Sequence, residues 1–189
     1  MPAERIAERI LIIGVGNPLM RDEGVGPRAA ELLMAGYAFP DNVEVVDAGT
    51  MGLSILNLLV DIDHLIVVDA IKDTGHAAGT VLVLAPEDIA DNQVMHSLHD
   101  MRLSDVLQNA MLIGKAPKNT VLIGVQIERI EEWVLELSPP VEAALPVAIA
   151  AVLDELDRLG VKPSPKTDSD IDAMVIEALR TYAPMPRTP

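Results

Sequence analysis

Residues 10–26 of the chain read ILIIGVGNPLMRDEGVG, and this stretch decides the fold. Its first residues form a continuous apolar run that leads into glycines, which is typical of a buried strand followed by a tight loop. From about Glu23 to Gly36 the apolar side chains recur at helical spacing, which predicts a helix after the loop. A buried strand that passes through a glycine-rich loop into a helix is the first unit of a parallel α/β sheet.

The same alternation continues along the chain. Strands are predicted at 43–46, 65–71 and 120–126, and helices at 51–60 and 103–112. A further strand at 80–84 follows its predecessor too closely for a parallel crossover, which needs a dozen or more residues, so it should run antiparallel or lie at an edge. We therefore expect an α/β three-layer sandwich: a twisted, mostly parallel sheet of about five strands with helices on both faces.

The C-terminal third contains the last predicted helix and a change of composition. Ser138 is a good N-cap and Pro139 suits the first helical position, whereas Pro146 falls inside the helix and should kink it. The chain beyond is polar and punctuated by proline. We expect one domain over residues 1–161 and a flexible extension over 162–189.

Composition and charge exclude several classes of function. The 189 residues suit one well-buried core, and the formal net charge of −15 argues against nucleic acid or an anionic membrane as a partner. Cysteine is absent, so any metal must be held by oxygen and imidazole nitrogen. No apolar run approaches the roughly 20 residues that span a bilayer, and the N-terminus reads as a strand rather than a secretory signal. We expect a cytoplasmic protein.

The loop after the first strand resembles a phosphate cradle only in part. Gly14 and Gly16 fit a dinucleotide-binding loop, but Leu19 replaces its third glycine. Asp22 and Glu23 place carboxylates where a pyrophosphate needs bare amides, which disfavours nucleotide binding. We expect Asp22 merely to complement the helix dipole, whereas the small residues around Glu23 suggest that another group approaches it closely.

Three acidic residues follow predicted strands. Glu23, Asp47 and Asp69 come after the first, second and third strands, and the carboxyl ends of parallel strands are where ligands bind. Asp69 lies in otherwise apolar surroundings, so its carboxylate needs a cation, a metal or several hydrogen-bond donors. A turn or helix cap is the alternative for Asp69.

Four histidines could complete a metal site. His64 leads into the third strand and His76 lies in a turn, so both should lie at the other end of the sheet or be exposed. His96 and His99 precede the helix at 103–112, and either could reach the carboxylates. Two carboxylates and one imidazole suit Zn²⁺ or Ni²⁺ and leave positions for water or substrate.

Several segments resemble the hydrogenase maturation endopeptidases, in the order in which that family has them. They are GVGNPLMRDEGVG at 14–26, VVDAGT at 45–50, DHLIVVDAI at 63–71 with GTV at 79–81, HDMRLSDVL at 99–107, LIGVQ at 122–126 and LSPPVEAAL at 137–145. The resemblance covers about residues 9–160. It implies an endopeptidase that removes a C-terminal peptide from the large-subunit precursor of nickel-iron hydrogenase after nickel has been inserted.

The same resemblance implies a site. Glu23, Asp69 and His99 would form the metal site, with His96 as the fallback and Asp47 as a supporting or substrate-contacting acid. Nickel arriving with the precursor is the implied ion, although zinc or another divalent ion suits the same ligands. A metal-dependent, monomeric peptidase is thus expected, and a non-catalytic chaperone that binds nickel or the precursor is the alternative.

Overall fold

The structure is a computed structural model that describes residues 7–85 and 103–167. Predictions that fall elsewhere, including those on His96 and His99, lie outside the described residues. The strands are β1 (Ile10–Val15), β2 (Tyr37–Ala38), β3 (Val43–Gly49), β4 (His64–Ile71), β5 (Val81–Leu84), β6 (Asn119–Gln126) and β7 (Ser164–Pro165). The helices are η1 (Arg21–Gly24), α1 (Val25–Gly36), η2 (Gly52–Asn57), α3 (Leu103–Leu112) and α4 (Pro139–Arg158), where η marks a 3-10 helix.

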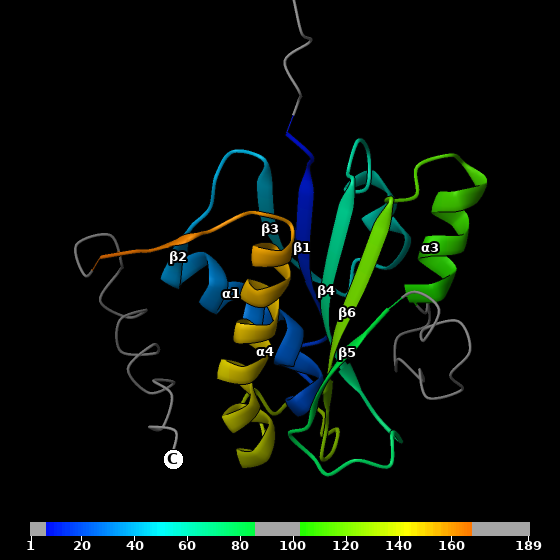
Figure 1. Cartoon of the computed structure of the whole chain (residues 1–189). Coiled ribbons are helices and arrows are strands. Elements are labelled where there is room, and N and C mark those ends of the chain that lie inside the picture. Colours follow the sequence, from blue (N-terminus) through cyan, green and yellow to red (C-terminus); the bar gives the residue numbers. More distant parts are fainter. Residues whose placement is uncertain (1–6, 86–102, 168–189) are drawn as a thin grey trace, which may run out of the picture.

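The main sheet has five strands in the order β3-β1-β4-β6-β5 (Figure 1). The β1, β3, β4 and β6 strands are parallel to their neighbours, whereas β5 runs antiparallel to β6 at the edge. Every residue of β4 is buried, as expected of a central strand that is covered on both faces. The prediction of a mostly parallel sheet with one antiparallel edge strand is confirmed.

Helices cover both faces of this sheet, which confirms the three-layer α/β prediction. Helices α1 and α4 pack with one face in one apolar cluster, and α3 and η2 pack against the other face in a second cluster (Figure 1). None of the described helices is both long enough and apolar enough to cross a bilayer.

The connections reverse the strand order at one place in the sheet. From β1 the chain moves to β3 on one side and then to β4 on the other side of β1, so the order reverses between β1 and β4. The carboxyl ends of these two strands lie at the lower edge of the sheet in Figure 1. In open α/β sheets this reversal is where ligands bind.

Two local predictions differ from the structure. The α-helix expected over 51–60 is the short 3-10 helix η2 followed by a turn, because Gly52 adopts a φ of +55° and only Ile55 and Leu59 of this stretch are buried. The helix expected from Glu23 begins at Val25, so Glu23 lies in η1 instead.

The start of the C-terminal extension has a defined place in the described structure. Strand β7 pairs antiparallel with β2, and the backbone N–H of Lys166 donates to the carbonyl of Gly36 at 2.9 Å. The flexibility expected of the remainder stays a prediction, because residues 168–189 lie outside the described part.

Candidate functional site

The fold brings Glu23 and Asp69 together near the carboxyl ends of β1 and β4. Glu23 lies in η1, which contacts β4, and its residue is 2% exposed. Asp69 lies near the carboxyl end of β4 and is 4% exposed. The two acids therefore come from different segments and are buried at the same place in the sheet.

Glycines allow η1 and α1 to approach the strands this closely. A side chain at Gly26 would collide with the carbonyl oxygens of Val15, at the end of β1, and of Val68, within β4. One at Gly16, whose φ is +143°, would collide with the carbonyl oxygen of Glu23. The glycines in this part of the sequence are thus required by close packing of backbone on backbone, and that packing positions Glu23.

The electrostatics of the pair favour a bound cation. Burial is the main cause that raises the pKa of Asp69 to about 8. The N–H of Ala70 opposes the rise by donating to Asp69 Oδ1 at 2.8 Å, and the nearby charge of Glu23 contributes to it. Two buried carboxylates repel one another when both are ionised. A divalent ion between them would remove this repulsion, and carboxylate oxygens are suitable ligands for it.

Asp47 lies at the same edge of the sheet but in a different setting. It is the residue of β3 that pairs with Gly14, so it belongs to the strand rather than to the turn after it. Its side chain is exposed, and Asp47 Oδ1 accepts a hydrogen bond from the N–H of Gly49 at 2.9 Å. The carbonyl of Gly49 in turn accepts the N–H of Gly16 at 3.0 Å, which ties this turn to the loop after β1.

The described histidines do not join the carboxylates. His64 begins β4 at the opposite edge of the sheet, where Glu8 contacts its Nε2 at 2.8 Å, and His76 is exposed between β4 and β5, as the sequence predicts for both. Within residues 7–85 and 103–167 no group of three His, Asp or Glu side chains could hold a metal ion. The expected third ligand, His99, lies outside these residues.

Asp22 has a role that the sequence did not reveal. It is fully buried and accepts hydrogen bonds from the N–H groups of Glu128, Arg129 and Ser138 and from the Ser138 hydroxyl, at 2.6–3.1 Å. The expectation that Asp22 merely complements a helix dipole is therefore wrong. Its carboxylate ties η1 to the segment between β6 and α4.

The same contacts change the role expected for the Ser138 side chain. Ser138 does occupy the N-cap position of α4, but its side chain makes no capping hydrogen bond there. The hydroxyl donates to Asp22 Oδ2 at 2.8 Å instead. In a capping hydrogen bond the serine oxygen would accept a backbone N–H, whereas here the hydroxyl donates to a buried carboxylate, and such charge-assisted hydrogen bonds are the stronger kind.

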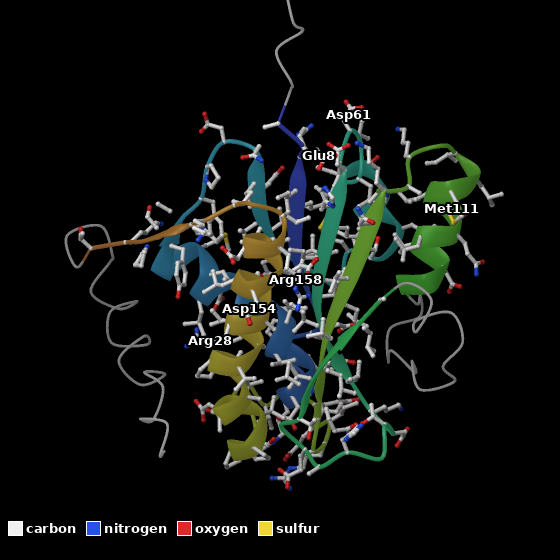
Figure 2. All side chains as sticks on the ribbon, viewed as in Figure 1. Glu8, Arg28, Asp61, Met111, Asp154 and Arg158 are labelled. Atoms are coloured by element: carbon white, nitrogen blue, oxygen red, sulfur yellow. The ribbon has the colours of Figure 1, made fainter. Side chains whose placement is uncertain are left out.

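A hollow of about 1470 Å³ lies at the opposite edge, near Glu8 and Asp61 at the upper end of Figure 2. Four of its polar side chains form one network: Lys118 binds Asp63 at 2.7 Å and Glu8 at 3.3 Å, and Glu8 also contacts His64. This network joins the starts of β1, β4 and β6. We assign this network a structural role, because it connects three neighbouring strands.

A sequence model of the hydrogenase maturation proteases matches residues 27–155 of the chain. The chain belongs to the hydrogenase maturation protease family. Among curated relatives of this protease, the hydrogenase 2 maturation protease of Escherichia coli (strain K12) is 39% identical over 161 residues, which span 84% of this chain and 96% of the relative. The hydrogenase expression/formation protein HoxM of Azotobacter vinelandii is 40% identical over 157 residues, or 82% of this chain and 75% of that protein.

Solved structures of maturation proteases share this fold. The hydrogenase maturating endopeptidase HybD from E. coli aligns with a TM-score of 0.75 at 38% identity, covering 85% of this chain and 99% of that one. The NiFe hydrogenase maturation protease HybD from Thermococcus kodakarensis aligns with a TM-score of 0.65 at 26% identity, covering 78% and 98%. The resemblance stated from the sequence motifs is thus confirmed at the level of the family and the fold.

Proposed function

We propose that this maturation protease removes the C-terminal extension of a nickel-iron hydrogenase large-subunit precursor once nickel has been inserted. Glu23, Asp69 and His99 are proposed to recognise the nickel and so position the scissile bond. The observation that carries the proposal is the burial of Glu23 beside Asp69 at the point where the strand order reverses. The similarity to hydrogenase maturation proteases supports the class of substrate.

The chemistry of the donor set suits this role. A divalent ion polarises a peptide carbonyl and activates a water molecule at neutral pH. Glu23 and Asp69 would hold it with carboxylate oxygens from one side. His99 would add an imidazole nitrogen, which suits Ni²⁺ and Zn²⁺ alike.

The nickel is proposed to belong to the precursor rather than to the resting protease. Without a cation, the raised pKa of Asp69 favours a protonated side chain beside Glu23, so the empty pair carries less negative charge. Engagement of nickel would require that proton to leave Asp69. Cleavage would then depend on nickel insertion, which makes the protease a checkpoint in hydrogenase assembly.

Asp47 is proposed to contact the substrate near the scissile bond. Its exposure at the same sheet edge leaves the carboxylate accessible, while its bond to the Gly49 N–H fixes its direction. We further infer that the protease works in the cytoplasm as a monomer.

The test is incubation of the purified protease with nickel-loaded precursor, followed by mass spectrometry of the precursor. Loss of a C-terminal peptide from nickel-loaded precursor, with no loss from nickel-free precursor, is the expected result. A stable complex without shortening would show instead a chaperone that uses the same acids for binding. Equal cleavage of nickel-loaded and nickel-free precursor would refute the proposal that cleavage depends on nickel insertion.

A further inference from the structure

The segment between β6 and α4 exposes large apolar side chains beside the proposed site. Trp133 is 80% exposed and Leu135 is 66% exposed, and Leu19, at 44%, lies next to them across a backbone hydrogen bond. Trp133 is the one tryptophan of the chain. Tryptophan and other large apolar side chains that stay exposed on a folded domain are typical of binding surfaces.

This segment is held in a fixed position relative to Glu23. The N–H of Trp133 donates to the carbonyl of Leu19 at 2.7 Å, and the N–H of Arg21 donates to the carbonyl of Val134 at 2.8 Å. The four hydrogen bonds to Asp22 hold both ends of the segment. The apolar side chains therefore adjoin η1, the element that carries Glu23.

Trp133 combines an exposed side chain with an unfavourable backbone conformation. Its φ is +64°, a left-handed conformation that costs a bulky residue free energy. Meanwhile Ile130 and Leu137 of the same segment pack against the core cluster beneath α4. Two apolar residues of the segment thus anchor it, and two others, Trp133 and Leu135, face solvent.

Acidic side chains surround the exposed pair. Glu128, Glu131, Glu132 and Glu136 are all exposed, and the two nearby arginines, Arg21 and Arg129, both lie against Glu131. The surface is therefore apolar at its centre and negative at its rim. Such a rim repels an anionic membrane and also a second copy of the same face, whereas it attracts a basic polypeptide surface.

We propose that Leu19, Trp133 and Leu135, within this rim of glutamates, form the docking surface for the hydrogenase large-subunit precursor. We call it the Trp133 surface. Its partner is a part of the precursor that presents apolar side chains flanked by lysine or arginine. The inference rests on the proposed function, and docking here places the precursor next to Glu23.

The test compares kinetics of two double variants on purified nickel-loaded precursor. Trp133→Asn with Leu135→Ser removes the apolar centre, and asparagine tolerates the positive φ at position 133 better than other non-glycine residues. Met111→Ser with Leu112→Ser is the matched control, since these side chains are 70% and 84% exposed on α3 toward the opposite edge (Figure 2). KM should rise about tenfold in the first variant with kcat little changed, because exposed aromatic anchors carry much of the binding energy of an interface.

An unchanged KM in the Trp133 and Leu135 variant, or an equal rise in the control, would overturn the docking surface while leaving the proposed function intact. Failure of the wild-type protease to shorten the precursor would instead overturn the proposed function. In that case the Kd for the precursor tests the docking surface by itself. A higher Kd in the Trp133 and Leu135 variant alone supports the surface, and equal Kd values for the wild type and both variants refute it. Self-association of the wild-type protein that the first variant abolishes would assign the surface to a second copy and refute the proposal.

Discussion

The Asp22 carboxylate and Ser138 lie 116 positions apart in the chain and meet in two buried hydrogen bonds. Asp22 Oδ1 accepts the N–H of Ser138 at 2.6 Å, and Oδ2 accepts its hydroxyl at 2.8 Å. Because Ser138 is the N-cap residue of α4 and Asp22 directly precedes Glu23, this contact links the helix layer to the proposed site. It also closes the segment that carries the Trp133 surface.

Asp22→Asn should destabilise the protease by about 1.5–3 kcal/mol, since hydrogen bonds to a buried charged group contribute about that much. Asparagine has nearly the same shape, but its amide NH₂ cannot accept the donors that face the carboxylate. Urea denaturation measures the loss. Asp157→Asn is the control, because Asp157 is exposed and pairs with Lys162 at the surface, so its loss should cost less than about 1 kcal/mol. Equal losses in both variants would contradict the role assigned to Asp22.

Gly26→Ala should lower the free energy of unfolding by about 3 kcal/mol or more, because backbone atoms of two strands block the added methyl group. Gly26 has no positive φ, so the cost comes from the collision with Val15 and Val68 alone. Precursor cleavage should fall as well, since α1 would move and take η1 with it. In the control Gly114→Ala, the new methyl group meets open space at a φ of +67°. That variant should cost about 1–2 kcal/mol and leave cleavage unchanged. Full cleavage by the Gly26 variant would show that close packing of α1 does not position the site.

The metal-free protease should become less stable as pH rises from about 4 toward about 8, because the folded state binds the Asp69 proton more tightly than the unfolded state does. The folded-state pKa of Asp69 is raised, so the proton is favourable to folding below that pKa and is lost as pH passes through it. The loss amounts to at most about 1.4 kcal/mol per pH unit. Denaturation of chelator-treated protein across this range measures the slope. Asp69→Asn should reduce it, and an identical slope in that variant would show that Asp69 is not protonated in the fold.

The sequence predicted the parts of the fold that depend on local patterns. The strand at 10–15, the antiparallel edge strand and the helix Leu103–Leu112 follow directly from apolar periodicity and from the length of the connections. The short 3-10 helix η2 could not be read in this way. Its spacing of leucines resembles an α-helix, yet Leu53 is 43% exposed in the structure.

Within the candidate site, only the residues that come at the ends of predicted strands could be identified from the sequence. Glu23 follows β1 and Asp69 lies near the end of β4, so their convergence at this edge of the sheet could be expected from the parallel sheet alone. The Asp22 contacts could not, because its partners lie 106 to 116 positions away in the chain. The sequence offered one signal for Asp22, a carboxylate within an apolar and glycine-rich stretch, and a helix dipole seemed to account for it.

Glu23 is proposed to hold the nickel of the precursor during cleavage, and the rate of precursor shortening by Glu23→Gln tests this role most directly. Glutamine keeps the shape of Glu23 but removes its charge, so kcat/KM should fall by at least about a hundredfold, as for loss of a metal-site group. Glu31→Gln, an exposed glutamate of α1 that pairs with Arg28, should cleave at the wild-type rate. Shortening of nickel-loaded precursor by Glu23→Gln at the wild-type rate would contradict the claim.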